Sequence, residues 1–412
     1  MASITVLGGC GTVGSTAVKT LAQGDWFSEI IIGDINITRA KEIIDSIGSD
    51  RVTAKSVDVT DPQSIRDAIR GSEIVLNCTG PFYKYVKTIL GTVIDSGTDY
   101  VDICDDVDVT MDILDMDDSA KASGITALIG MGSSPGTTNL LARFASDNLL
   151  DSTESIDIYH AHGGEPVEGE GVIGHRFHCM SIDIPMFLDG ELKTVKFFDK
   201  EGIELQEEVD FYKLGKGIRV YPYPHPEQVT IPRHIKTRRV TNKGTVLPAE
   251  YYDLIKDMCR LGLSSREPID VKGQEVIPYD FAVAYILRQR EVILEKTGFG
   301  VQKGCVKVVV KGKKDGKPQE YVFSIASEGQ ALGEGTGIPA AMGAILLSQG
   351  KIKEKGVLPP EGAVDPMDFF SLLPEVVTLG ERGGKSFEGV LVENIDEHGN
   401  VTIIDTSEFL GI

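Results

Sequence analysis

Residues 4–14, Ile-Thr-Val-Leu-Gly-Gly-Cys-Gly-Thr-Val-Gly, decide the fold, because they join an apolar run to glycines spaced G-x-G-x-x-G. Gly9 allows a tight turn, Gly11 lets the backbone approach a pyrophosphate, and Gly14 lets the next helix pack on the strand. A helical pattern follows from Ser15 to Gln23, which is the context that the motif requires. The stretch therefore predicts a dinucleotide site with phosphates at a helix N-terminus.

A carboxylate stands where the second strand of this unit ends. The predicted strand Glu29–Gly33 is followed by Asp34, and a carboxylate there accepts hydrogen bonds from ribose hydroxyls and repels a 2′-phosphate. We therefore predict NAD as the cofactor. NADP remains open, because Arg39 is close enough in sequence to reach a 2′-phosphate. The predicted cofactor-binding residues are Gly9, Gly11, Thr12, Val13, Gly14, Asp34, Arg39, Asp58, Val59, Cys78, Thr79, Gly80 and Pro81.

Strand-like and helical runs alternate up to Gly130, and the strands are almost continuously apolar. This pattern is typical of a parallel sheet that helices cover on both faces. We predict an α/β fold with a doubly wound Rossmann domain over residues 1–131. After Gly132, strand-like runs alternate apolar and polar residues, which favours a largely antiparallel sheet; these runs are 155–162, 175–184, 194–198 and 229–240. Residues 132–332 are therefore predicted to form an α+β substrate-binding and dimerisation domain.

The last part of the chain shows two further patterns. An Ala-rich run at 340–348 predicts a helix that begins after Pro339. Residues 387–392 and 401–404 flank a His-Gly-Asn turn and predict a hairpin within a C-terminal segment, 381–412. This hairpin carries no functional signal.

Composition excludes several classes of protein. The 412 residues are enough for two or three domains, and the formal net charge is −21. An acidic surface argues against binding to nucleic acid or to an anionic membrane. No run approaches the ~20 apolar residues of a membrane span, and a strand begins too early for a signal peptide. Six scattered cysteines without a C-x-x-C motif favour free thiols in the cytoplasm.

Histidines and arginines gather in the second domain. His160 and His162 alternate along a predicted strand, so both are expected on one face; no third ligand is evident, and we predict no metal. His162 is a candidate for proton transfer, because histidine titrates near neutrality. Arg176 and Arg233 are candidates to bind a substrate carboxylate, although surface ion pairs remain an alternative for each. His225 lies in a proline-rich stretch, 221–227, that is either a substrate lid or an edge segment.

Several segments along most of the chain resemble the saccharopine dehydrogenase family, which includes saccharopine reductases, lysine 6-dehydrogenases and carboxynorspermidine dehydrogenases. They occur in the family's order: Gly9–Gly14, Asn77–Phe82, Ser96–Asp102, Gly132–Gly136, His162–Pro166, Gly335–Ala341 and Gly356–Glu361. The resemblance implies hydride transfer between nicotinamide and an amine or imine carbon. It also implies a homodimer, and a return of residues 333–380 to the first domain. His162 stands where glutamate-forming saccharopine reductases carry cysteine, which favours the lysine-dehydrogenase-like or carboxynorspermidine branch.

Such a reaction requires a general base with a pKa near the working pH. Asp105 and Asp106 follow the fifth predicted strand, whose end faces the cofactor, although either can instead cap the next helix. We predict Asp105, His162 and Tyr83 as catalytic residues, with an amino acid or polyamine as substrate. The predicted function is oxidation at a carbon–nitrogen bond or its reverse. Reductive coupling of an amine with a carbonyl compound, and a dinucleotide sensor without catalysis, are the alternatives.

Overall fold

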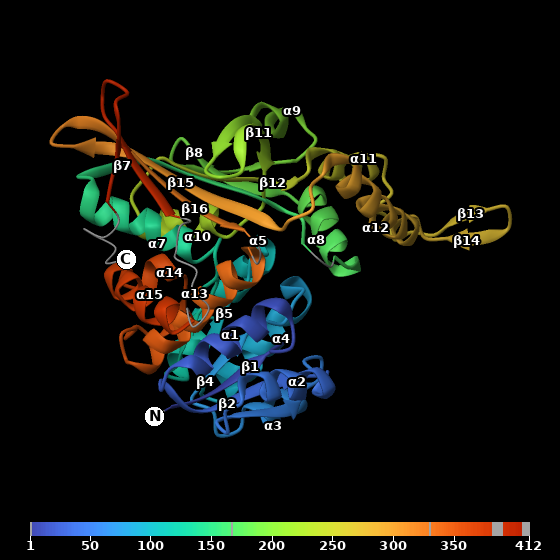
Figure 1. Cartoon of the computed structure of the whole chain (residues 1–412), viewed down its shortest axis with the longest axis vertical. Helices are drawn as coiled ribbons and strands as arrows, with labels where there is room; N and C mark the ends of the chain where they lie inside the picture. The colour runs from blue at the N-terminus through green and yellow to red at the C-terminus, as the bar shows by residue number, and fades with distance from the viewer. Residues whose placement is uncertain (1, 166–167, 329–330, 381–389, 406–412) are drawn as a thin grey trace.

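A computed structural model of the chain describes residues 2–165, 168–328, 331–380 and 390–405 (Figure 1). One sheet contains seven parallel strands in the order β17-β6-β5-β4-β1-β2-β3, with the reversal of order at β1 and β4 that defines a doubly wound sheet. Its strands are β1 (Ala2–Leu7), β2 (Phe27–Asp34), β3 (Val52–Ser56), β4 (Ile74–Asn77), β5 (Asp99–Asp102), β6 (Thr126–Leu128) and β17 (Gly356–Leu358). The predicted Rossmann fold is confirmed.

The strands of the parallel sheet are buried because helices cover the sheet. Residues such as Ile4, Val6 and Ile32 have no exposed surface. The helices are α1 (Thr12–Gln23), α2 (Ile37–Ile47), α3 (Pro62–Ile69), α4 (Phe82–Asp95), α5 (Val107–Leu114), α6 (Asp117–Ala122), α13 (Ala331–Ser348), α14 (Pro360–Ala363) and α15 (Pro366–Gly380). Since β17, α14 and α15 lie in sequence between two strands of the second sheet, β16 (Lys317–Glu328) and β18 (Val390–Ile395), the chain returns from the second part to the first and then enters the second again (Figure 1).

Helix α13 begins nine residues earlier than the sequence indicates, and Pro339 lies inside it. Glycines lower helix propensity, so residues 331–339 do not look helical in isolation. Here they allow α13 to approach α1: a Cβ on Gly337 would lie 2.7 Å from the carbonyl oxygen of Val13. Close packing against α1 therefore stabilises a helix that local propensity does not predict.

The second sheet has ten strands and is mostly antiparallel, as predicted; only β7 and β12 pair in parallel. Its main order is β10-β11-β12-β7-β15-β16-β18-β19, and β8 joins β9 to β12. The strands are β7 (Ser152–Gly163), β8 (Ile184–Leu188), β9 (Glu191–Val195), β10 (Glu207–Phe211), β11 (Gly215–Pro222), β12 (Arg239–Leu247), β15 (Lys303–Lys314), β16 (Lys317–Glu328), β18 (Val390–Ile395) and β19 (Val401–Ile403). The C-terminal hairpin β18–β19 thus extends this sheet; residues 387–389 of the prediction lie outside the described part of the chain.

Helices and a small hairpin complete the second domain. They are α7 (Thr137–Phe144), a π-helical turn η1 (Ala145–Leu149), α8 (Glu170–Ser181), α9 (Lys200–Glu204), α10 (Glu227–His234), α11 (Ala249–Arg260), α12 (Pro278–Thr297), β13 (Ile269–Val271) and β14 (Gln274–Val276). The β13–β14 hairpin extends away from the rest of the molecule (Figure 1). No helix in the described ranges is long and apolar enough to cross a membrane.

Two predicted strands are wrong. Residues 175–184 belong largely to α8, where Ile173, Phe177 and Met180 are buried at helical spacing. Residues 229–240 contain the end of α10 and only the start of β12. In both stretches the apolar residues fit period two and period 3.6 almost equally well, so packing decides between strand and helix. As a result, the predicted substrate residues Arg176 and Arg233 lie on helices and not on strands.

Candidate active site

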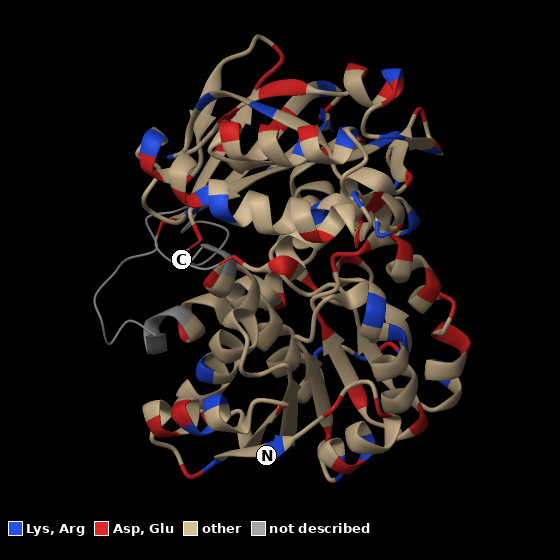
Figure 2. Cartoon of the chain, turned by 90° about the vertical axis from the view of Figure 1, so that its right-hand side faces the viewer, with Lys and Arg blue, Asp and Glu red and all other residues tan. Residues whose placement is uncertain are grey.

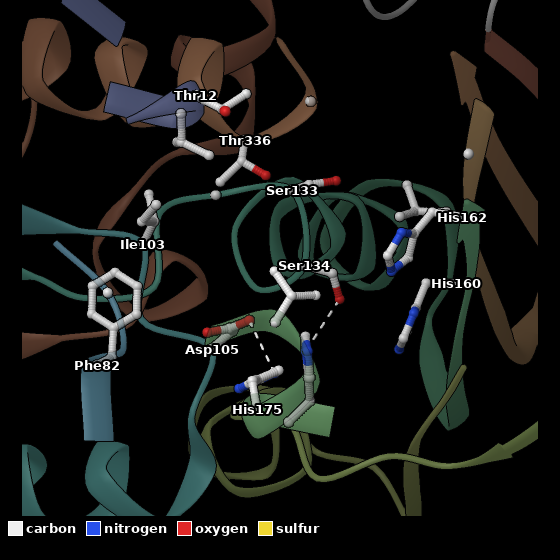
Figure 3. A pocket seen from close by; sticks show the side chains of 18 of the residues that line it. Thr12, Phe82, Ile103, Asp105, Ser133, Ser134, His160, His162, His175 and Thr336 are labelled. Carbon is white, nitrogen blue, oxygen red and sulfur yellow. Dashed lines mark hydrogen bonds and ion pairs between the residues drawn. The ribbon is translucent and has the colours of Figure 1, made fainter. Parts of the chain in front are cut away.

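A cavity of about 600 Å³ lies between the carboxyl ends of the first sheet's strands and the second sheet. The glycine turn and the end of β4 line one side, and β7, α8 and the loop before α10 line the other (Figure 3). This is where ligands bind in open parallel sheets. Eleven predicted residues line it: Gly11, Thr12, Val13, Gly14, Cys78, Gly80, Pro81, Asp105, His162, Arg176 and His225.

The glycine turn fits a dinucleotide. A Cβ on Gly14 would lie 2.2 Å from the carbonyl oxygen of Gly8, and a Cβ on Gly9 would lie 2.9 Å from Cγ2 of Ile32. These two glycines are therefore required by the protein's own packing. A Cβ on Gly11 would meet only the Gly8 oxygen, at 3.5 Å, which is ordinary contact. Gly11 lines the cavity, and the absence of a side chain there lets a pyrophosphate approach the backbone.

Asp34 lies at the end of β2, beside the glycine turn. One carboxylate oxygen accepts a hydrogen bond from the backbone N–H of Cys10 at 3.0 Å, and the other accepts one from Asn36 at 2.9 Å. These bonds hold the negative charge where the adenosine ribose is expected. Arg39 is exposed and pairs with Glu42 at 2.7 Å.

Three further predicted cofactor residues, Asp58, Val59 and Thr79, are not among the residues that line the cavity. Asp58 accepts hydrogen bonds from the hydroxyl and backbone N–H of Thr60, which lower the pKa of its carboxyl. Val59 packs against the core of the first domain. The backbone N–H of Thr79 donates to Asn77 at 2.9 Å. Asp58 thus stabilises a turn, which is one of the roles that its position in the sequence allows.

Two adjacent aspartates follow β5 and pair with one histidine of α8. His175 Nδ1 lies 3.2 Å from Asp106 Oδ1, and Nε2 lies 3.9 Å from Asp105 Oδ2 (Figure 3). Asp106 is buried and also accepts the backbone N–H of Tyr83. The side chain of Asp105 is 38% exposed, so Asp105 presents the carboxylate of this group to the cavity.

These groups perturb one another's pKa values. Burial raises the pKa of Asp105, and Asp106 raises it further, while His175 opposes the shift. Burial alone would lower the pKa of His175, but Cys179 and the two aspartates outweigh it and raise that pKa well above its usual value. Perturbed carboxyl and imidazole groups in one cavity are typical of acid–base sites. The ligand atoms of Asp105, Asp106 and His175 lie within 4.8 Å of one another, a spacing that also suits a metal ion.

Three histidines form the opposite wall. His160 and His162 project from β7 on the same side, as the alternation predicts (Figure 3). His162 Nδ1 lies 2.6 Å from Glu165 Oε1, and His225 Nδ1 lies 3.0 Å from Glu227 Oε2. The ring of His160 stacks on that of His225 at 5.5 Å.

The proline-rich stretch around His225 is neither a lid nor an edge segment. Residues 221–231 are buried and connect β11 to α10 beneath the cavity. The backbone N–H of His225 donates to Gln228 at 2.9 Å, and the Gln228 amide donates to the carbonyl oxygen of Tyr223. This bracing holds His225 in the cavity wall.

The remaining predicted residues occupy less direct positions. Arg176 reaches the cavity wall but is buried and paired with Glu168, which also binds Arg290 at 3.0 Å. Arg233 is exposed on α10 and is absent from the lining. Tyr83 also lies outside the lining and stacks on His178 at 4.7 Å.

Sequence reasoning missed His175, Glu165, Glu227 and Ser134. The misassigned stretch 175–184 carries His175, and Glu227 lies two residues before the misassigned stretch 229–240, so long-range contacts bring both side chains to the site. A signal existed for Ser134, because it lies in a Gly-Ser-Ser-Pro-Gly turn directly after a strand of the parallel sheet. For the glutamates, no local pattern distinguishes them from surface acids.

Comparison with known proteins agrees with this geometry. Residues 4–128 match the saccharopine dehydrogenase NADP binding domain. A carboxyaminopropylagmatine dehydrogenase of Synechocystis sp. is 24% identical, with 91% of this chain and 96% of that protein covered. A carboxynorspermidine synthase of Vibrio cholerae is 25% identical, with 89% and 94% covered. Apo saccharopine dehydrogenase (L-Glu forming) of Saccharomyces cerevisiae has the same fold, with a TM-score of 0.64, 17% identity and 91% and 97% coverage.

The domain match thus confirms the family resemblance over residues 4–128, which are similar to the saccharopine dehydrogenase NADP binding domain. The chain as a whole has the same fold as the saccharopine dehydrogenase of Saccharomyces cerevisiae.

Proposed function

We propose that this chain is an NAD(P)-dependent oxidoreductase that joins an amine to a carbonyl compound by reductive coupling, acting on a carbon–nitrogen bond of an amino acid or polyamine. The observation that carries the proposal is the position of Asp105, a partly exposed carboxylate with a raised pKa in the cavity that the glycine turn opens into. The names of the two relatives describe amines that also carry a carboxylate, which supports the coupling direction over simple amine oxidation.

The residues of the chain account for the proton transfers. An amine enters as an ammonium ion, which Asp105 attracts and then deprotonates, so that the neutral nitrogen attacks the carbonyl carbon. Because burial raises its pKa, Asp105 is a stronger base than an ordinary aspartate carboxylate. A reduced nicotinamide cofactor, which the glycine turn would hold, would supply the hydride for the resulting carbon–nitrogen double bond. Gly80 also lines the cavity, and a Cβ there would meet no atom within 4 Å, so the cavity is open at this position.

The proposal is tested by mixing the protein with reduced nicotinamide cofactor, a diamine or agmatine, and an amino acid that carries an aldehyde. We expect cofactor absorbance at 340 nm to fall only when amine and aldehyde are both present, with one equivalent of secondary amine detected by mass spectrometry. Consumption with the aldehyde alone would contradict reductive coupling. The dinucleotide sensor would be favoured if the protein bound the cofactor but turned over no amine and aldehyde pair. In that case it should also fail to oxidise lysine or saccharopine with the oxidised cofactor.

We also propose that NAD(H) is preferred over NADP(H), because Asp34 is held at the ribose position by two backbone N–H groups and Arg39 is engaged by Glu42. Asp34→Asn retains an acceptor oxygen and removes the charge. We expect it to lower the preference for NADH over NADPH about tenfold, which corresponds to about 1.4 kcal/mol. Fluorescence titration with each cofactor measures this, and Arg39→Ala is the control. A wild-type preference for NADPH would contradict the proposal.

We propose in addition that the chain is a homodimer, as the family resemblance implies. The β13–β14 hairpin and the adjacent α12 expose Ile269, Val271, Phe281 and Tyr285 to 52%, 44%, 54% and 37%. A two-stranded hairpin is marginally stable by itself, and exposed apolar groups of this kind mark interaction sites. A second copy of the chain is the expected partner. Light scattering is expected to give twice the chain mass, and a monomer at micromolar concentration would contradict the proposal.

A further inference from the structure

The buried pair His225–Glu227 sits in the cavity wall opposite Asp105 and has no role in the proton transfers described above. His225 is 6% exposed and lines the cavity, and Glu227 is completely buried behind it. The two side chains meet at 3.0 Å through Nδ1 and Oε2. Because Glu227 engages Nδ1, Nε2 is the ring nitrogen left to face a substrate.

Two hydroxyl groups hold the carboxylate of Glu227 in place. Ser134 donates to its Oε1 at 2.5 Å, and Thr138 donates to the same oxygen at 3.0 Å. Ser134 lies in the loop before α7 and Thr138 lies in the first turn of that helix, whereas Glu227 is the first residue of α10. A carboxylate without solvent is costly unless it is paired, so this arrangement favours an imidazolium at His225.

Titratable groups from three other parts of the chain also face His225. Asp105, after β5, favours its protonated form, while His175 on α8 disfavours it. His160 on β7 stacks against the ring and is itself neutral, because burial and the two neighbouring histidines lower its pKa well below the usual value. Burial lowers the pKa of His225, but Glu227 and Asp105 outweigh it, and the net direction is upward.

We propose that His225 is the general acid of the coupling reaction and that Glu227 positions it and keeps it protonated. This inference rests on the proposed function. The Nε2 proton of His225 moves to the hydroxyl oxygen of the carbinolamine formed from amine and aldehyde. The C–O bond then breaks and water leaves, while the nitrogen lone pair forms the C=N bond. The iminium carbon accepts a hydride, for which reduced nicotinamide is the donor and becomes oxidised, and the product is a secondary amine.

In this scheme Asp105 acts as the general base and His225 as the general acid. One wall of the cavity holds a carboxyl group that removes a proton from the amine, and the other wall holds an imidazolium that gives a proton to the leaving hydroxyl. Carbinolamine dehydration needs acid, and a proton donor in contact with the substrate accelerates such a step by about 10²–10⁴-fold. A histidine that is paired with a buried glutamate, and whose pKa is raised above its ordinary value, is suited to this task.

The test uses His225→Gln and Glu227→Gln in the full chain. We expect His225→Gln to lower kcat at least about 100-fold with little change in cofactor affinity. Glu227→Gln removes the charge that raises the pKa of His225, so the alkaline limb of the kcat profile should move to lower pH by at least about one unit. The direction follows because the acid form of His225 is active and its pKa falls.

A second readout does not depend on turnover. The titration of the His225 ring, followed by NMR of histidine-labelled protein, should move to lower pH in Glu227→Gln and should stay in place in Glu361→Gln. Glu361 is another fully buried glutamate nearby, and it binds Asn139 at 2.8 Å instead of a histidine. His398→Gln is the control for kcat, because His398 is an exposed histidine 3.4 Å from Glu397 and far from the cavity in sequence and fold.

Failure of the inference and failure of the proposed function look different. If no amine and aldehyde pair is coupled by the wild-type protein, the proposed function fails. If the wild-type protein turns over but His225→Gln keeps kcat within about threefold, the inference is overturned. The same holds if Glu227→Gln lowers stability and kcat without moving the pH profile or the NMR titration, because Glu227 would then serve folding alone.

Discussion

Asp105→Asn is expected to lower kcat for coupling by about 10²–10⁴-fold while the affinity for reduced cofactor changes less than about threefold. The amide cannot accept a proton from the ammonium ion, yet it keeps the shape of the side chain. Asp105 is the partly exposed member of the group with Asp106 and His175, so the substitution removes the base without removing the buried Asp106–His175 pair. Steady-state kinetics with saturating amine and aldehyde measure the loss.

The pH profile of the wild-type protein gives an independent check on Asp105. Burial raises its pKa above that of an ordinary aspartate, so activity should decline on the acid side at a higher pH than an exposed aspartate would give. The control is Asp112→Asn, a surface aspartate that pairs with Lys87 at 2.9 Å and lies outside the cavity. Retention of full activity by Asp105→Asn would rule out the proposed deprotonation of the amine by Asp105.

Gly14→Ala is expected to have the second large effect, because the new Cβ would lie 2.2 Å from the Gly8 carbonyl oxygen and 2.9 Å from the Gly9 Cα. These are backbone atoms, so the turn between β1 and α1 must move. We expect a loss of roughly 1–3 kcal/mol in stability from overpacking. The dissociation constant of the cofactor should rise at least about 100-fold, about 2.7 kcal/mol, because the N–H groups that receive the pyrophosphate are displaced.

Thermal unfolding and fluorescence titration separate these two effects. Gly91→Ala is the matched control, since this glycine lies within α4 and a Cβ there meets only the Met116 methyl group at 3.6 Å. Alanine is favoured over glycine inside a helix by roughly 0.5–1 kcal/mol, so this control should be slightly more stable and bind cofactor normally. Normal cofactor affinity in Gly14→Ala would show that the turn does not bind the phosphates.

The parallel sheet and its cofactor turn could be predicted because the controlling interactions are local. Buried parallel strands must be apolar along their length, and Gly14 is required by the backbone of its own turn, since a Cβ there would lie 2.2 Å from the Gly8 carbonyl oxygen. Asp105 and Cys78 could be placed for a related reason: both follow strands of that sheet, and all such strand ends meet at one edge.

The second domain was less predictable where the apolar residues of one stretch fitted both the strand period of two and the helix period of 3.6. His175, Phe177 and Cys179 alternate as a strand would, yet they lie on α8, because Phe177 packs with Ile173 and Met180 in a separate core. The error mattered for function. The predicted strand made Arg176 a candidate to bind a substrate carboxylate, whereas the helix places its guanidinium in a buried ion pair with Glu168.

The sequence by itself therefore determined the Rossmann fold, its dinucleotide turn and one carboxylate at the carboxyl end of the parallel sheet. Apolar strands and glycine spacing are patterns within short stretches of the chain, and the ends of parallel strands meet at one edge. Only the tertiary structure decided which groups face Asp105. His175, His225 and Glu227 come from elements remote in the chain, and their protonation depends on burial and on charges brought together by packing. No local sequence pattern encodes burial or charge pairing, since both exist only after the chain has folded.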